Sequence, residues 1–357
     1  MGKIYYYIKK DPNNFEGKDK ISFVIYNYLK KYYNIEIIKI LDKHNFSYKN
    51  ADIIHINSSG ILEAIRCYSI KGLKIYSLYS NLKANPIYLI KDFIDFFKIK
   101  HENLNVPIIY LLKRLLFPIL LSIIPWFVIK KILERENTVV VLPNNYLYKK
   151  LKLKNAKIVP IGVDIKKFYK KETIKDYRKT TIAYVGHPAV DKGIIEVAKI
   201  FSKLDNKKFK KVMFLTNLNI NIDYLKSIDP NIEIFGPQED IVKVYNTIDI
   251  LILPYRHEIS SIAIPLVLIE AMACEVPIIT SDLPHLREIG KDSLIYVKPF
   301  DIDGFVKEIN NLANNPEKRL EIGKKARNII EKHYNEKIML EEYKKLYDYL
   351  LKRCKNE

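Results

Sequence analysis

The sequence is poor in cysteine, with 3 in 357 residues, and these are not spaced as metal ligands or as a redox pair. Cys67, Cys274 and Cys354 lie far apart, with no C-x-x-C motif among them. Zinc sites and disulfide scaffolds need cysteines at short, characteristic spacings. We therefore expect neither a structural metal nor a disulfide framework, and we expect a reducing compartment.

The sequence also lacks an export signal and a long apolar run. The opening residues, MGKIYYYIKKDPNN, contain no apolar stretch followed by a small-residue cleavage site, so we expect a cytoplasmic protein. The uninterrupted apolar part of residues 106–131 is 15 residues long, from 115 to 129, whereas a membrane-spanning helix needs about 20. Pro118 and Pro125 would also break or kink such a helix. A transmembrane anchor is therefore not expected.

Two readings of residues 106–131 stay open. Trp126, with Lys130 and Lys131 after it, is typical of a helix that lies in a membrane interface, here at the inner face of the membrane. The alternative is a helix packed in the core of the first domain. The formal charge of +19 favours a polyanionic partner such as a phosphorylated ligand or an anionic membrane. A general excess of lysine would explain the same charge, and no aromatic-interleaved basic motif supports nucleic-acid binding.

Length and pattern predict two α/β domains. A chain of 357 residues with 48% apolar content exceeds one ordinary core. Short β-branched runs alternate with amphipathic stretches, which predicts parallel sheets covered by helices. The first series of strands is predicted at 3–8, 35–40, 52–56, 74–78, 138–142 and 157–160. The second series is predicted at 181–185, 211–216, 232–235, 248–253, 276–280 and 294–297.

The domain boundaries follow from where the pattern restarts. A lysine-rich polar stretch, residues 161–181, separates the two series. We predict an N-terminal Rossmann-like domain at 1–163 and a C-terminal one at 164–335, both doubly wound. Long amphipathic helices are predicted at 302–313, 316–334 and 336–353. The last of these, within a tail at 336–357, is expected to cross back to the N-terminal domain.

Loops after strands are where such sheets bind ligands, and two loops of the second domain carry suitable residues. Gly186 ends the first strand, and Lys192 precedes a helix whose free N–H groups favour phosphate. The second loop precedes a helix predicted at 265–274 with Pro265 at its first position. The backbone at its positive end also suits an anion; the candidates there are Ser260, Ser261, Ile262 and Leu266. Glu270, farther along, needs a partner if it is buried.

Five segments, in this order and spacing, resemble the motifs of the group 1 glycosyltransferases, retaining enzymes of family 4 with the GT-B fold. The segments are IVPIGVDIKKF, YVGHPAVDKGI, IFGPQEDIVKVYNTIDILILPYR, VLIEAMACEVPIITSDLPHLREI and NNPEKRLEIGKKARNIIEKHYNEK. The resemblance covers roughly residues 159–349. The resemblance implies a nucleotide-sugar donor, a hydroxyl acceptor, a cleft between two domains, and no metal or other cofactor.

The resemblance also implies roles for single residues. Lys192 matches the lysine that contacts the donor diphosphate and stabilises it as it leaves, while His187 stands where arginine is usual. Gly236 matches a glycine near the nucleotide base. Glu270 matches the second glutamate of an E-x(7)-E motif, a ligand of the ribose hydroxyls.

Two positions depart from the pattern. The first glutamate of that motif is replaced by Ile262, and we expect Glu258, in the same loop, to take its catalytic place. Glu275 replaces a common glycine, which puts the usual tight turn in doubt. The N-terminal half matches only in pattern, and there Gly17 and Lys18 are expected near the donor phosphates or the acceptor. His55 fits a locally hydrogen-bonded strand histidine better than a catalytic one.

The expected activity is therefore transfer of a sugar, with retention, to an acceptor hydroxyl. The apolar, basic segment favours a lipid or lipid-linked acceptor, and a soluble acceptor stays open. Two other classes also fit: a non-catalytic nucleotide-sugar-binding protein and a nucleotide-sugar epimerase.

Overall fold

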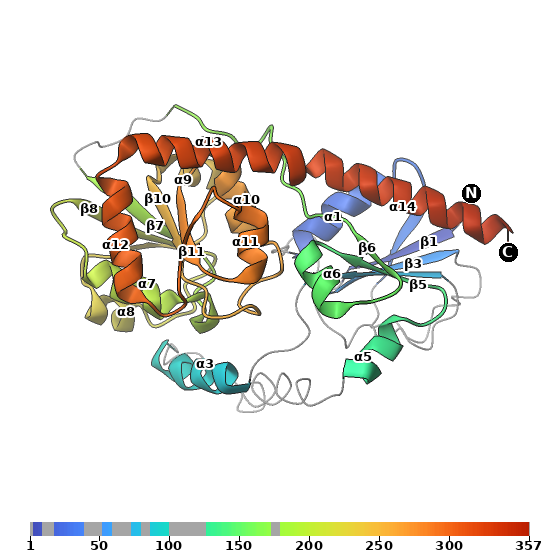
Figure 1. Ribbon diagram of the computed structural model, residues 1–357, viewed down its shortest axis with the longest axis horizontal. Coiled ribbons are helices and arrows are strands. Elements are labelled where there is room, and N and C mark those ends of the chain that lie inside the picture. The colour runs from blue at the N-terminus through green and yellow to red at the C-terminus, as the bar shows by residue number, and fades with distance from the viewer. Residues whose placement is uncertain are drawn as a thin grey trace.

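The computed structural model describes residues 3–8, 18–38, 52–58, 73–79, 86–99, 126–172 and 179–356. These residues form two lobes, each built on a six-stranded parallel sheet (Figure 1). The N-lobe is built on the sheet of residues 3–158, and the C-lobe on the sheet of residues 180–297. Every predicted strand is present, with ends that differ by at most two residues.

The N-lobe sheet has the order β2-β1-β3-β4-β5-β6, and every pairing is parallel. Its strands are rich in Ile, Val and Tyr because both faces are covered. They are β1 (Lys3–Tyr7), β2 (Asn34–Ile38), β3 (Ile53–Ser58), β4 (Leu73–Leu78), β5 (Thr138–Leu142) and β6 (Ala156–Ile158). The helices described in this half of the chain are α1 (Lys18–Leu29), α3 (Pro86–Ile99), α5 (Trp126–Leu133) and α6 (Asn145–Leu151).

The C-lobe sheet has the order β12-β11-β10-β7-β8-β9, again all parallel. Its strands are β7 (Thr180–Gly186), β8 (Phe209–Leu215), β9 (Glu233–Phe235), β10 (Ile250–Leu253), β11 (Ile278–Ser281) and β12 (Ile295–Val297). Around them lie η3 (Val190–Lys192), α7 (Ile194–Ser202), α8 (Ile222–Ile228), α9 (Ile241–Thr247), α10 (Leu266–Ala273), α11 (Pro284–Gly290), α12 (Ile302–Ala313) and α13 (Pro316–His333). The strand order changes direction between β10 and β7. Sheets of this kind bind ligands at such a switch point.

Each lobe carries a helix from the other half of the chain. The C-terminal helix α14 (Glu336–Asn356) leaves the C-lobe and packs on α1. In the opposite direction, α3 packs on η3 and α8 of the C-lobe. Figure 1 shows α13 and α14 running along one side of both lobes, and α3 beneath the C-lobe on the other side.

The two places where the chain passes between the lobes touch each other. Val163 N donates to Tyr334 O at 2.8 Å, and Glu336 N donates to Val163 O at 3.0 Å. Gly162 permits this approach, because a Cβ there would lie 2.6 Å from backbone atoms of Asn335. Most apolar side chains near this junction belong to one core cluster that continues from Ile4 to Leu350.

The two ends of α10 differ from what the sequence pattern suggests. Pro265 precedes α10 as its N-cap and is not its first helical residue, because its ψ of 127° is extended. Glu275 makes the turn after α10 in place of glycine, with a left-handed φ of 57°. That turn packs closely on Gly323, whose Cβ would meet Glu275 O at 2.3 Å. Residues 106–125 lie outside the described residues, as does Gly17.

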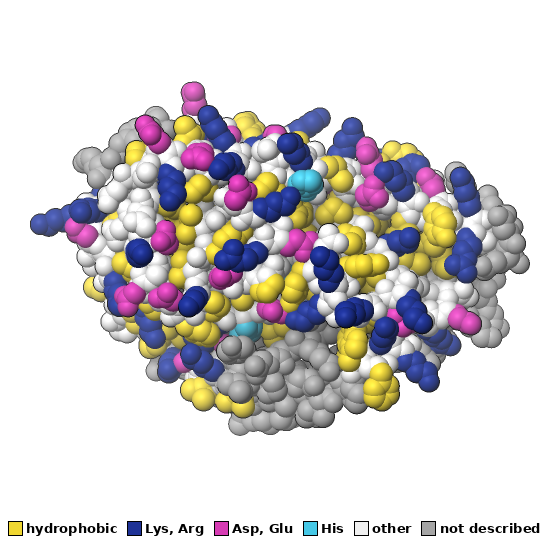
Figure 2. All heavy atoms as spheres, viewed as in Figure 1, with side chains coloured by type: hydrophobic (Ala, Val, Ile, Leu, Met, Phe, Trp, Pro, Cys, Tyr) yellow, Lys and Arg dark blue, Asp and Glu magenta, His cyan; other side chains and the backbone are white. Residues whose placement is uncertain are grey.

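The distribution of charged and apolar side chains on the surface is relevant to the expected polyanionic partner and to membrane contact. Figure 2 shows Lys and Arg spread over this face with Asp and Glu between them, and with apolar side chains exposed among them. That pattern agrees with a generally lysine-rich surface. In the part of the chain that the structure describes, no helix is long and apolar enough to cross a membrane.

Candidate active site

The loops predicted to bind the donor form one row along the C-lobe sheet. Gly186 ends β7, Thr216 follows β8, Gly236 follows β9 and Pro254 follows β10. The strands are parallel and adjacent, so their carboxyl ends meet at one edge. Thr216 N donates to Gly186 O at 3.1 Å and ties two of the loops together.

Lys192 is held by the segment that follows β10. Gly193, with φ +81°, leaves no room for a side chain, because a Cβ would lie 2.0 Å from Pro254 O. The Lys192 ammonium lies 5.6 Å from the centroid of the Tyr255 ring. One residue farther, Arg256 N donates to Asp191 O at 3.2 Å. Three consecutive residues thus line the turn that carries Lys192.

The positive charge of Lys192 is not neutralised by an ion pair with any described carboxylate. Burial lowers the pKa of Lys192, and the nearby charge of Asp191 only partly opposes that shift. The effective dielectric constant is low in this buried position, so the Lys192 ammonium attracts an anion more strongly than it would in water. The turn leads into α7, whose N-cap Gly193 supplies no side-chain cap. An uncapped helix start beside a buried ammonium is a favourable position for an anion.

His187 joins the loops after β7 and β8. Its Nδ1 lies 2.5 Å from Thr216 Oγ1, and its backbone O accepts a hydrogen bond from the Tyr184 hydroxyl at 2.7 Å. The imidazole is thus fixed next to Gly186. It offers an anion less charge than an arginine would.

The loop after β9 presents exposed apolar side chains. Phe235 is 42% exposed and stacks on Phe214, with ring centroids 5.4 Å apart. Leu218, 44% exposed, packs over Gly236, since a Cβ there would lie 3.4 Å from its side chain. A planar base could lie on such a surface, because aromatic and apolar faces bind bases by stacking.

Glu270 is buried on α10 and is paired across the lobes. Its Oε2 accepts a hydrogen bond from the Tyr245 hydroxyl at 2.9 Å, and its Oε1 lies 3.5 Å from Lys20 Nζ on α1. Burial raises the pKa of Glu270, while Lys20 and Tyr245 act in the opposite direction. A buried carboxylate with only these partners has lone pairs left for ligand hydroxyls. Of the predicted N-lobe residues, Lys18 begins α1, and Lys20 two residues later makes this contact.

The loop between β10 and α10 is held from both sides. Ser260 Oγ accepts from His257 N at 3.0 Å, so this hydroxyl stabilises the loop itself. Ser261 Oγ lies 3.3 Å from His285 Nε2. Ile262 is half-buried against the main core. Leu266 begins α10, which has no side-chain cap at its start.

Glu258 does not lie free in the cleft. Its Oε2 is hydrogen-bonded by the Tyr146 hydroxyl and by Lys150, both on α6 of the N-lobe. Burial acts to raise the pKa of Glu258, but the hydrogen bonds from Lys150 and Tyr146 outweigh it and leave the pKa below its ordinary value. The carboxylate is therefore ionised at neutral pH and joins the two lobes. Its role as a substitute for a glutamate at 262 stays a prediction.

Arg256 ties α3 to the C-lobe at the back of the Lys192 turn. Its guanidinium lies 3.0 Å from Asp92 and 2.8 Å from Asp95 of α3, and 2.9 Å from Glu196 of α7. The side chain is 1% exposed. His257 adds a contact of 2.5 Å to Asp92. Removing one member of a buried charge cluster leaves the others uncompensated, so we regard this cluster as the support of the turn.

Some of the buried polar atoms without a partner lie near the carboxyl ends of the strands. Among the described residues, four buried side-chain atoms make no hydrogen bond: Asn57 Nδ2, Asn155 Oδ1, Ser281 Oγ and His285 Nδ1. Asn57 is the last residue but one of β3, Ser281 ends β11, and His285 lies at the start of α11. Asn155 lies elsewhere, at the amino end of β6. An unmet buried polar group costs roughly 1–3 kcal/mol, so such groups are expected where a polar ligand binds. No three His, Cys, Asp or Glu side chains in the described ranges are grouped to hold a metal ion.

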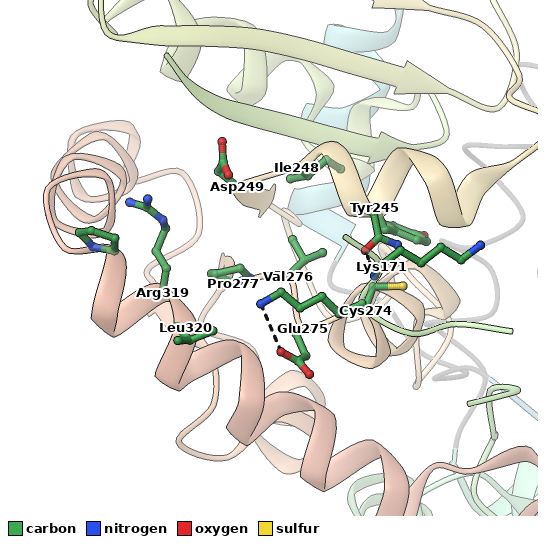
Figure 3. Close-up of a pocket in the computed structure, with 13 residues that line it drawn as sticks. Lys171, Tyr245, Ile248, Asp249, Cys274, Glu275, Val276, Pro277, Arg319 and Leu320 are labelled. Carbon is green, nitrogen blue, oxygen red and sulfur yellow. Dashed lines mark hydrogen bonds and ion pairs between the residues drawn. The ribbon is translucent and has the colours of Figure 1, made fainter. Parts of the chain in front are cut away.

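A separate hollow lies on the opposite edge of the C-lobe sheet (Figure 3). Ile248 and Pro277, at the amino ends of β10 and β11, line it together with Arg319 of α13. Lys170 Nζ lies 3.4 Å from a carboxylate oxygen of Glu275 there. Tyr245 lines this hollow, and its hydroxyl bonds Glu270. The hollow lies at the amino ends of the strands and is therefore separate from the candidate donor-binding loops, which follow their carboxyl ends. Tyr245 lies between the two.

Superposition on solved structures agrees with the two-lobed fold described above. Over 98% of the chain the structure superposes on a glycosyltransferase from Rickettsia africae, with a TM-score of 0.67, 14% identity and 99% of that chain covered. It also superposes on Anabaena HepE in complex with UDP-glucose, with a TM-score of 0.68, 11% identity, and 98% and 100% of the two chains covered. At such low identity these likenesses establish the fold, which is the GT-B fold expected from the sequence.

The sequence comparisons match part of the chain to a known family. Residues 179–315 match the family model described as glycosyl transferases group 1, so this part of the chain is a group 1 glycosyltransferase domain. The resemblance seen in the motifs is thereby confirmed. The capsular polysaccharide biosynthesis glycosyltransferase CapM of Staphylococcus aureus is 26% identical over 238 residues. That match covers 63% of this chain and 59% of CapM.

The structure also shows residues that sequence patterns missed. The cross-lobe partners Lys20, Tyr146, Lys150 and Asp92 belong to the weakly matching N-terminal half. Nothing in their local sequence marks them. Tyr245 and His285 do lie inside matched motifs, but only their burial and their partners show that they face the site.

Proposed function

We propose that the chain is a retaining glycosyltransferase that moves a sugar from a nucleotide diphosphate sugar to an acceptor hydroxyl. The observation that carries this proposal is the Lys192 ammonium, which lies next to an uncapped helix start and has no ion-pair partner among the described carboxylates. Sugar transfer needs positive charge where the diphosphate departs. Charge fixed in advance at that point is usually the largest catalytic contribution.

The other loops supply the rest of a donor site. The diphosphate would lie between Lys192 and the start of α10, with His187 as a hydrogen-bonding group beside it. Glu270 would accept hydrogen bonds from the ribose hydroxyls, exchanging Lys20 for them as the lobes move. Phe235 and Leu218 would form the apolar surface under the base. The sugar would then project toward the N-lobe, where the acceptor hydroxyl must enter.

The acceptor in this proposal is a lipid or a lipid-linked glycan at the inner face of the cytoplasmic membrane. On α5, Phe127 is 72% exposed, and Lys130 and Lys131 follow it one turn later. On α3, Ile90 and Ile94 are exposed one turn apart. In Figure 1 both helices lie along the same lower margin of the molecule. Exposed apolar residues with flanking cations favour contact with an anionic interface.

Donor binding is tested by the thermal unfolding of the protein with a panel of nucleotide sugars. A donor that binds the folded state raises the melting temperature by mass action. Lys192→Ala and Glu270→Ala should each abolish most of that rise. Lys199→Ala, which removes an exposed lysine in the last turn of α7, away from the Lys192 turn, is the matched control and should preserve it. An unchanged rise in both site variants would refute the assignment.

Turnover separates this proposal from the two other classes. A transferase forms a glycosylated product with a lipid-linked or soluble acceptor and also hydrolyses its donor slowly. A non-catalytic binding protein shows the thermal shift without product. An epimerase converts the donor to a second nucleotide sugar with no acceptor present. Anomeric analysis of the product by NMR tests retention.

A further inference from the structure

His285 is a buried histidine that none of the donor-site residues discussed above explains. It lies in the first turn of α11, 1% exposed, with its ring centroid 6.0 Å from that of Tyr146 in the N-lobe. A histidine in an apolar core position normally satisfies both ring nitrogens. Here only Nε2 is bonded, to Ser261 Oγ at 3.3 Å, and Nδ1 has no partner among the described residues.

The ring is neutral at physiological pH. Burial lowers the pKa of His285 to about 4, and the nearby charges of Lys150 and Lys192 act in the same direction, whereas Glu258 opposes them. A neutral imidazole has one donor and one acceptor nitrogen. Since Nε2 uses one of these on Ser261, Nδ1 offers the other, whichever tautomer is present.

Contacts place His285 where the two lobes meet, with its ring beside Tyr146 of α6 and its Nε2 bonded to the loop before α10. Lys192 and Lys150 both act on the ring, one from the diphosphate turn and the other from α6. The loop that carries Ser261 continues directly into the N-lobe contacts. Ala263 N donates to Tyr79 O at 2.7 Å, and Asn144 Nδ2 donates to Ala263 O at 3.2 Å. A group attached to a diphosphate at Lys192, and extending toward the N-lobe, passes this corner.

We propose that His285 is a specificity residue whose Nδ1 hydrogen-bonds one hydroxyl of the transferred sugar, with Ser261 fixing the ring. This inference rests on the proposed function, because it concerns which part of the nucleotide sugar is recognised near His285. It also assigns a polar group to the corner where Ile262 leaves no carboxylate. The class of substrate is a nucleotide diphosphate sugar with a free hydroxyl directed at Nδ1.

A matched pair of substitutions separates the two ring nitrogens. The amide of asparagine occupies nearly the place of Nδ1, whereas the amide of glutamine reaches the place of Nε2. We expect His285→Gln to bind the donor sugar about 3–10-fold more weakly, the loss of one neutral hydrogen bond, and His285→Asn to retain most of the affinity. Binding of the free nucleoside diphosphate should be unchanged in both variants. Calorimetric titration with nucleotide and with nucleotide sugar measures the difference.

The wild-type protein supplies a second readout that needs no substitution. The Nδ1 resonance of His285 in ¹⁵N-histidine-labelled protein should shift on addition of the nucleotide sugar and stay unchanged with the nucleotide alone. A deoxy sugar that lacks the recognised hydroxyl should lose both the shift and the extra affinity. Circular dichroism of each variant without ligand checks that it folds.

The outcomes distinguish the two levels of the proposal. If the wild type binds no nucleotide sugar in the panel, the proposed function fails, and this inference fails with it. If the wild type binds a nucleotide sugar but His285→Gln binds it equally well and the Nδ1 resonance does not move, the role of His285 alone is overturned.

Discussion

The two helices that cross between the lobes are held by different chemistry. α3 is fixed to the C-lobe by buried charges, with the Arg256 guanidinium among Asp92, Asp95 and Glu196. α14 is fixed to the N-lobe by a neutral network, in which His55 Nδ1 lies 2.7 Å from the Tyr347 hydroxyl and Nε2 lies 2.8 Å from Ser77 Oγ. Apolar side chains of α1 and α14 pack around that network.

The two contacts are therefore sensitive to different changes. A buried charge cluster depends on every member, because each removal leaves an uncompensated charge. A buried neutral network depends on the protonation of its histidine, because no carboxylate of the described residues is hydrogen-bonded to the His55 imidazole. The α3 contact supports the turn that carries Lys192, so its failure should reach the donor site. The α14 contact should affect stability alone.

The largest expected effect comes from breaking the charged contact. Arg256→Met keeps the length of the side chain but leaves three acidic residues without their shared cation, which should cost about 3–5 kcal/mol of unfolding free energy. Hydrogen exchange of the α3 amides should rise strongly, and donor affinity should fall because the Lys192 turn loses its support. Chemical denaturation followed by exchange mass spectrometry measures both effects.

The chain offers the same substitution at an exposed pair. Arg287 binds Asp282 with its side chain 54% exposed, so Arg287→Met should cost no more than about 1 kcal/mol. It should leave exchange of α3 unchanged. Equal destabilisation by the two substitutions would show that the cluster around Arg256 contributes no more than a surface pair.

The next effect is the pH dependence of the neutral contact. Burial lowers the pKa of His55 to about 3, against an ordinary value of 6.5 in the unfolded chain. Between these values the unfolded chain binds a proton that the folded protein does not, so stability falls as the pH falls below about 6.5. The slope for one such group approaches 1.4 kcal/mol per pH unit. Urea denaturation from pH 7 to pH 4.5 should show it.

A variant isolates this contribution from other acid-sensitive groups. His55→Gln keeps an amide near Ser77 and removes the titrating ring, so its stability should fall less steeply with decreasing pH than that of the wild type. His333→Gln, at an exposed position on α13, should leave the wild-type slope unchanged. Identical slopes in all three proteins would mean that His55 does not titrate as its burial implies.

Sequence reasoning predicted the fold well because the information is local. Period, turn residues and strand composition are properties of neighbouring residues, and they specified both sheets and the helices at 302–313 and 316–333. The loops of the C-lobe site follow for the same reason. Lys192 directly precedes the helix predicted after the first strand of this lobe, whereas the close approach of Gly193 to Pro254 is seen only in the structure.

The cross-lobe contacts could not be predicted in this way. The sequence around Glu270 cannot show what pairs with this buried carboxylate, because its partner Lys20 is 250 residues away in the sequence. α3 lies between β4 and β5 in the chain, yet packs on the other lobe. Glu258 shows the same limit: its loop was identified, but its contacts with α6 depend on how the lobes meet.

The smallest expected effect concerns the rim of the α14 contact. The Tyr33 hydroxyl donates to Asp348 at 2.6 Å, and burial together with this bond raises the pKa of Tyr33. Tyr33→Phe should therefore cost about 0.5–1.5 kcal/mol, as for one ordinary hydrogen bond. Tyr32→Phe, at the neighbouring exposed position, should cost less than about 0.5 kcal/mol. If Tyr33→Phe has no effect while His55→Gln does, α14 is held by its buried network alone, and its polar rim contributes only solubility.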